Sequence, residues 1–324
     1  MVLIFCEADD LTARDVLRKL KILNYEFVVF SERDTIQFEV SIENSLLNTK
    51  VLKNNSFLCY LENIDSIWFR RQDVMVPKLD VLGAEFKDLT GYSKQHSLDQ
   101  VNYIRTKLNQ KKCLGTFGKA NFNKIEFLEA CVSLNILTPK TLISRNKLDI
   151  IDFINSNRNG TIVKSLAFPF YKERTQEHGM TKFIGFTSEI TVDDVNNCND
   201  TMDISIFQEK LEKYVELRVI YLDGESFCEC VFSQLTDESV LDMRLGLGFN
   251  SKMKTCSFDL PQQIKDDIVD LMNKINLNFG AIDIILTTDM DYVFIEVNPN
   301  GQIDATCDNI GLNIADRITN FLIK

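Results

Sequence analysis

The chain has 324 residues, of which 45% are hydrophobic and 26% are charged, as is typical of a globular protein with two or three packed units. Its formal net charge of −11 disfavours a general nucleic-acid binder, and no run approaches the roughly 18 uncharged apolar residues of a membrane span. Nine scattered cysteines without a CxxC pair, and only two histidines, argue against a disulfide framework, a zinc site and a Ser–His–Asp or Cys–His nucleophile.

The first part of the chain predicts an α/β unit over residues 1–113. Its strand candidates are rich in β-branched and aromatic residues. They are MVLIFC, EFVVFS and IDSIWF. Between the first two, LTARDVLRKLKIL has the apolar spacing of a helix, with Thr12 or Asp10 as its N-cap. Residues 80–112 are polar and predict helices that lead away from the strands. The N-terminus lacks the features of a secretion signal, so we expect a cytoplasmic protein.

A second unit is expected over residues 114–206. It alternates helices and strands, which are NKIEFLEACVSLNIL, KTLIS, LDIIDFINSN, GTIVKSL and TKFIGFTSEI. Before the last strand lies FPFYKERTQEHGM, which reads as a polar loop. Its Lys172, Arg174 and His178 make it a candidate phosphate lid, and an ordinary solvated connection fits equally well.

A third unit is expected over residues 207–324. Its elements are strands around SIFQEKL, VELRVIYLDGE and FCECVFSQL, the helix PQQIKDDIVDLMNKIN, the hairpin AIDIILTTDMDYVFIEVN and the helix GLNIADRITNFLI. Strands and helices mix throughout, so the fold class is α/β or α+β with several units.

The hairpin is the most informative part of the sequence. A two-residue loop at Asp289–Met290 or Met290–Asp291 would place Asp283 on the same face as Glu296 and Asn298. A three-residue loop would put Asp283 on the opposite face, unless a bulge restored the register.

Three oxygen donors among apolar neighbours favour a Mg²⁺ site, since Mg²⁺ takes hard oxygen ligands and clustered carboxylates need a cation. The alternative is an edge hairpin whose polar residues face solvent. The turn Pro299-Asn300-Gly301-Gln302, which follows directly, favours the metal site.

The segment IDIILTTDMDYVFIEVNPNGQ resembles the C-terminal signature of ATP-grasp ligases. The resemblance implies that Asp283, Glu296 and Asn298 hold two Mg²⁺ ions on the phosphates of ATP. Further segments resemble the family in the expected order over residues 114–324, and they imply a three-unit fold whose central and C-terminal domains clasp ATP. The ATP-binding residues implied are Lys124 and Lys164 for phosphate, Gln208, Glu209 and the backbone at Leu211 for adenine, and Glu216 for ribose. Arg218 would meet phosphate or acyl phosphate.

A narrower resemblance is to the graspetide (microviridin-type) peptide macrocyclases. SIWFRRQ resembles their W-[FY]-R-R-P element with Gln72 for proline, and Asp242-Met243-Arg244 resembles their D-W-R element. Arg244, oriented by Asp242, would steer the substrate carboxylate. Arg70 and Arg71 would serve the substrate or an interdomain contact, and the structural role is favoured.

This resemblance implies an ADP-forming macrocyclase that activates Glu or Asp side chains of a precursor peptide and joins them to Ser/Thr hydroxyls or Lys amines. The expected partner is the precursor, leader plus core, with no nucleic acid or membrane, and a homodimer is compatible. One alternative is a RimK-like ligase that adds free amino acids to a protein or small acid. Another is a catalytically silent nucleotide-binding module.

Overall fold

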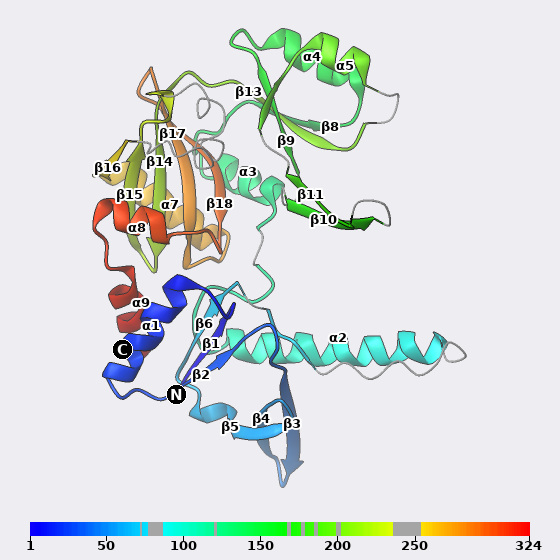
Figure 1. The fold of residues 1–324 in the computed structure, drawn as a ribbon, viewed down its shortest axis with the longest axis vertical. Coiled ribbons are helices and arrows are strands. Elements are labelled where there is room, and N and C mark those ends of the chain that lie inside the picture. Colours follow the sequence, from blue (N-terminus) through cyan, green and yellow to red (C-terminus); the bar gives the residue numbers. More distant parts are fainter. Residues whose placement is uncertain are drawn as a thin grey trace.

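The computed structural model describes residues 1–71, 73–76, 87–119, 122–166, 170–175, 179–184, 187–198, 202–235 and 254–324. Within these ranges the chain forms five sheets with helices packed against them (Figure 1). Among the described helices, none combines the length and the apolar character that a transmembrane span needs.

The N-terminal sheet is four-stranded and parallel, in the order β2-β1-β6-β7. Its strands are β1 (Val2–Cys6), β2 (Phe27–Phe30), β6 (Ser66–Arg70) and β7 (Lys112–Leu114). Every residue of β1 is buried, because alternate side chains enter separate apolar clusters on the two faces. Helix α1 (Leu11–Ile22) follows β1 and is capped by Asp10, whose side chain accepts from the backbone N–H of Ala13. The predicted strands and helix are confirmed.

A second N-terminal sheet was not predicted. Strands β3 (Ile36–Glu43), β4 (Leu46–Lys53) and β5 (Ser56–Tyr60) form an antiparallel meander, followed by a short 3₁₀ helix over 61–63. Asn44 and Ser45 at one turn and Asn54 and Asn55 at the other have positive φ, as two-residue hairpin turns require. A single long helix, α2 (Lys87–Asn109), then extends away from the molecule (Figure 1).

The middle of the chain builds a four-stranded antiparallel sheet in the order β12-β9-β13-β8. Its strands are β8 (Thr141–Ser144), β9 (Thr161–Ser165), β12 (Ser188–Ile190) and β13 (Ser205–Glu209). Helices α4 (Lys147–Ser156) and α5 (Val192–Asn197) cover one face through Ile150 and Val195, which pack with Phe207. Helix α3 (Lys124–Ser133) precedes this sheet.

The expected loop FPFYKERTQEHGM is not a loop throughout. Its middle forms β10 (Phe170–Thr175), which pairs in antiparallel fashion with β11 (Gly179–Ile184) as a separate hairpin. The sequence FYKERT has no apolar/polar alternation, so its strand depends on pairing with β11 rather than on a local pattern. The predicted strand TKFIGFTSEI is divided between β11 and β12.

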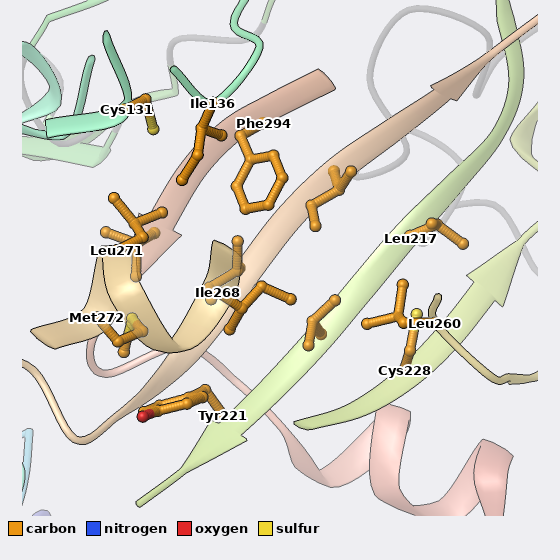
Figure 2. Close-up of a cluster of buried hydrophobic side chains, with 14 of the residues drawn as sticks. Cys131, Ile136, Leu217, Tyr221, Cys228, Leu260, Ile268, Leu271, Met272 and Phe294 are labelled. Atoms are coloured by element: carbon orange, nitrogen blue, oxygen red, sulfur yellow. The ribbon is translucent and has the colours of Figure 1, made fainter. Parts of the chain in front are cut away.

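The C-terminal sheet is five-stranded and antiparallel, in the order β16-β15-β14-β17-β18. Its strands are β14 (Lys213–Leu222), β15 (Glu225–Val231), β16 (Thr255–Phe258), β17 (Phe279–Thr287) and β18 (Tyr292–Asn298). Helix α7 (Gln262–Lys274) covers one face, and its Ile268, Leu271 and Met272 belong to the same buried cluster as Leu217 and Phe294 (Figure 2). On the opposite face, Ile220 and Ala281 pack in the apolar cluster that includes Cys307 and Ile314, and charged residues occupy neighbouring positions along the strands.

Two further helices follow the sheet, α8 (Asp304–Ile310) and α9 (Ile314–Ile323). Helix α9 returns to the N-terminal sheet, where it packs beside α1, and the Ser66 hydroxyl donates to the Leu322 carbonyl at 2.6 Å. The two ends of the chain therefore share a core. The domain boundaries at 113/114 and 206/207 stay a prediction.

Candidate active site

Four charged residues form a row across the face of the C-terminal sheet that lies opposite α7. Glu229 on β15 lies opposite Arg218 on β14, Arg218 lies opposite Asp283 on β17, and Asp283 lies opposite Glu296 on β18. Directly opposed residues of neighbouring strands share a face, so all four project away from α7. Asn298, two residues beyond Glu296, lies on the same face.

The hairpin loop differs from the prediction. The Thr287 N–H donates to the Asp291 carbonyl, so the loop holds three residues, 288–290, with Met290 at φ 69°. Such a loop by itself would oppose Asp283 to Ile295. A bulge at Ile295 adds one residue to β18 and brings Glu296 opposite Asp283. The predicted two-residue loop is wrong, and the shared face results from the bulge.

Arg218 and Asp283 form a close ion pair, with 2.6 Å between Nη1 and Oδ1. Burial raises the pKa of Asp283 to about 6, because the charged form loses hydration; Arg218 opposes this shift and Glu296 adds to it. The carboxylates of Asp283 and Glu296, which lie opposite each other on neighbouring strands, repel each other. The site therefore favours a bound cation.

The donor set fits Mg²⁺. Asp283, Glu296 and Asn298 supply carboxylate and carboxamide oxygens, the hard ligands that Mg²⁺ prefers. The Asn298 amide donates to Glu296 Oε1 at 3.1 Å, so these two side chains are in contact. The described residues contain no group of three or more His, Cys, Asp or Glu suited to a metal, so the ligand set depends on the asparagine.

Two lysines from the middle of the chain were expected near the phosphates. Lys124 begins α3, where Asn123 caps the helix, and its ammonium lies 3.8 Å from Glu296 Oε2 and donates to the Ser165 carbonyl at 2.9 Å. Lys164 lies on β9 opposite Ile206, on the face of its sheet away from α4 and α5. The structure thus brings Lys124 close to Glu296. Lys164 directly precedes Ser165, whose carbonyl accepts from Lys124.

The residues expected for adenine lie on β13 and the link to β14. Gln208 is buried and donates to Thr141 Oγ1 at 3.1 Å, and it shares a sheet face with Lys164. The carboxylate of Glu209 accepts from the Lys140 N–H at 2.8 Å, and Leu211 is half-buried between the strands.

Glu216, expected for ribose, lies two residues before Arg218 on the same strand face. Its carboxylate accepts from Lys213 Nζ at 2.9 Å and from the Ser233 hydroxyl at 2.7 Å. Asp242 and Arg244 lie outside the described residues, as do Gln72 and His178. Lys172 and Arg174 lie on β10.

Glu229 and Asn309 were not predicted from the sequence. Glu229 is 3% exposed beside Arg218, and its carboxylate accepts a hydrogen bond from the Asn309 amide of α8. The signal was a glutamate between Cys228 and Cys230, since alternation with two core residues places it on the opposite face.

No protein-family model matches the sequence, and neither does any curated protein. Solved structures do match. A RiPP-associated ATP-grasp ligase from Chryseobacterium gregarium, solved with ADP and a leader and core peptide, aligns with a TM-score of 0.77 and 20% identity over 99% of this chain and 94% of that chain. The macrocyclase MdnC from Microcystis aeruginosa MRC, bound with the precursor peptide MdnA, aligns with a TM-score of 0.75 and 20% identity over 100% of this chain and 99% of that chain.

D-alanyl-alanine synthetase A from Vibrio cholerae aligns with a TM-score of 0.51 and 15% identity over 100% and 98% of the two chains. The chain therefore has the fold of the ATP-grasp ligases, as predicted. By TM-score it is more similar to the ligases and macrocyclases solved with peptides, at 0.77, 0.75 and 0.68, than to this synthetase, at 0.51.

Proposed function

We propose that this protein is an ATP-dependent, ADP-forming peptide macrocyclase that acts on a ribosomal precursor peptide. The observation that carries the proposal is the row of Arg218, Asp283 and Glu296 on one sheet face, with Lys124 3.8 Å from Glu296. Two carboxylates, an arginine and a lysine at this spacing suit a metal-bound triphosphate.

The ATP site would lie between the sheet of β9 and β13 and the sheet of β14 and β17. Gln208, Glu209 and the Leu211 backbone would bind adenine, Glu216 the ribose, and Lys124 and Lys164 the phosphates. Asp283, Glu296 and Asn298 would hold Mg²⁺, which neutralises phosphate charge and so makes the γ-phosphorus open to attack. Structures of the same fold contain ADP, AMPPNP and Mg, which supports these ligands.

The proposed reaction has two steps, phosphorylation of a peptide carboxylate and ring closure. A Glu or Asp carboxylate of the peptide attacks the γ-phosphorus, which gives an acyl phosphate and ADP. A Ser or Thr hydroxyl or a Lys amine of the same peptide then attacks the acyl carbon, loses its proton and displaces phosphate. Closure of each ring removes one water molecule from the peptide. Arg218 would stabilise the charge on the acyl phosphate, and Arg244, oriented by Asp242, would hold the peptide carboxylate.

This route needs no covalent nucleophile on the enzyme. Burial raises the pKa of the Cys307 and Cys131 thiols to about 12, so both remain protonated at neutral pH. Catalysis would then depend on positioning and on charge stabilisation.

The peptide substrate is supported by structures of the same fold that contain a leader and core peptide, the precursor MdnA or a minimal precursor. We extend this to a leader-plus-core precursor as the substrate of a cytoplasmic enzyme that binds neither nucleic acid nor membrane, and a homodimer is compatible.

The test is a coupled assay of ADP formation with three additions: a precursor peptide encoded beside the gene, free amino acids, or buffer. The proposal requires ADP formation that depends on the peptide and on Mg²⁺. ADP formation only with free amino acids would instead support a ligase of the RimK-like kind. Nucleotide binding without ADP in any arm would support a silent module.

A further inference from the structure

We infer that Arg70 and Arg71 of the N-terminal unit are positioning residues for the metal-binding end of β18. Together with Arg218 they form an arginine clamp on the backbone of residues 300–302. The inference rests on the proposed function, because the ligands that the clamp would orient are Glu296 and Asn298.

Three consecutive carbonyl groups each accept a hydrogen bond from a different arginine. Arg71 Nε donates to the Asn300 carbonyl at 3.2 Å, and Arg70 Nη1 donates to the Gly301 carbonyl at 2.9 Å. Arg218 Nη2 donates to the carbonyl of residue 302 at 3.2 Å. The turn begins directly after Asn298, whose own carbonyl accepts from the Gly301 N–H at 3.1 Å. Fixing the turn therefore fixes the end of the strand that carries the ligands.

The clamp is anchored in the N-terminal unit by a buried carboxylate. Asp10 Oδ2 lies 3.1 Å from Arg70 Nε and 3.6 Å from Arg71 Nη1, while Oδ1 accepts the Ala13 N–H that starts α1. The Arg70 side chain is 0% exposed and that of Asp10 is 1% exposed. Asp10 Oδ2 and Arg70 Nε make an ionic contact without hydrogen-bond geometry, and removing one partner of such a buried pair is strongly destabilising. Both arginines thus hold the turn from the N-cap of α1.

The turn is tightly packed at Gly301. A Cβ atom on Gly301 would lie 3.0 Å from Ala281 Cβ and 3.1 Å from Arg218 Nη2. Contacts run continuously from Arg70 through the turn to Arg218, which in turn binds Asp283. A shift of the turn would therefore displace the arginine and the carboxylate together.

Two variants test the inference. The Arg71 side chain is 21% exposed and that of Arg70 is 0% exposed, so Arg71→Gln is the variant less prone to unfold the protein. Arg70→Lys keeps a positive charge for Asp10 but loses the planar fork that reaches both Asp10 and the turn. Arg317→Gln is the matched control, because Arg317 of α9 forms a surface ion pair with Glu225 of β15 rather than a hydrogen bond to the turn.

The measurement is Mn²⁺ binding in the presence of AMPPNP, followed by electron paramagnetic resonance of free Mn²⁺, with melting temperature recorded in parallel. We expect Arg71→Gln and Arg70→Lys to weaken Mn²⁺ binding about tenfold, the usual effect of losing a group that orients a ligand, at temperatures where each variant is folded. Arg317→Gln should bind as the wild type does.

Unchanged Mn²⁺ affinity in both clamp variants would overturn the inference and leave the proposed function standing. Loss of affinity only in step with unfolding would also overturn it, since that pattern indicates a merely structural role. A wild-type protein that binds no Mn²⁺ with AMPPNP would contradict the proposed site itself.

Discussion

Replacing Glu296 by glutamine removes one carboxylate from the proposed metal site while keeping the size of the side chain. Glu296 lies opposite Asp283, contacts Asn298 and approaches Lys124 at 3.8 Å. Glutamine retains an oxygen that can accept from Asn298, but it loses the charge. We expect Glu296→Gln to lower ATP turnover by roughly two to three orders of magnitude and to leave the protein folded and soluble.

The expected effects of Glu296→Gln on stability and on turnover differ greatly in size. The Lys124 and Glu296 side chains are 26% and 30% exposed, so their ion pair contributes less than about 1 kcal/mol. Removing the charge also relieves repulsion with Asp283, which offsets part of that loss. Charge stabilisation by a bound metal is worth several kcal/mol, and a loss of about 3 to 4 kcal/mol lowers turnover roughly 100- to 1,000-fold.

The assay is ADP release with peptide and Mg²⁺, and urea unfolding gives the stability. Glu225→Gln is the matched control, because Glu225 also forms an ion pair, with Arg317 at 3.0 Å, but on the surface. The control should turn over ATP at the wild-type rate. A fully active Glu296→Gln enzyme would refute the proposed metal role.

Three further outcomes are expected. Gly301→Ala should lower turnover about tenfold and destabilise the fold by roughly 1 to 3 kcal/mol, because the added Cβ atom would press on Arg218 and Ala281. Equal turnover rates for Gly301→Ala and the wild type would argue against tight packing at this residue. Phe294→Ala should lower the free energy of unfolding by about 3 to 5 kcal/mol in urea, since this ring is 1% exposed in the core of Figure 2. Burial opposes ionisation of Asp34, but hydrogen bonds from Ser31, Asn54 and Lys53 outweigh it and lower its pKa to about 2. The stability that ionised Asp34 contributes is present at neutral pH and is lost as the pH falls from about 4 towards 2. The free energy of unfolding of Asp34→Asn should therefore fall less than that of the wild type across this window. An identical fall in the two proteins would contradict the lowered pKa of Asp34.

The regular elements could be predicted from local patterns. The strand at Val2–Cys6, the helix at Leu11–Ile22 and the strands around Glu296 follow from apolar spacing, turn residues and capping groups. The charged pair Glu216 and Arg218 also follows, because residues two apart on a strand share a face. These features depend only on neighbours in the sequence.

Features set by the partner strand could not be predicted in the same way. The bulge at Ile295 depends on how β17 and the loop at Met290 fit together, and the sequence of β18 contains no local sign of it. The burial of Glu229 depends on α8, which lies far along the chain. The contact of Arg70 with the Gly301 carbonyl joins residues 231 apart, so only the folded chain shows it.

The most direct test of peptide carboxylate activation uses a precursor peptide whose Glu and Asp side chains carry oxygen-18. The peptide is incubated with the enzyme, ATP and Mg²⁺, and the released phosphate and the peptide are analysed by mass spectrometry. Activation through an acyl phosphate predicts one labelled oxygen in the phosphate for every water lost from the peptide. Unlabelled phosphate alongside ring formation, or ADP without any change in the peptide, would contradict it.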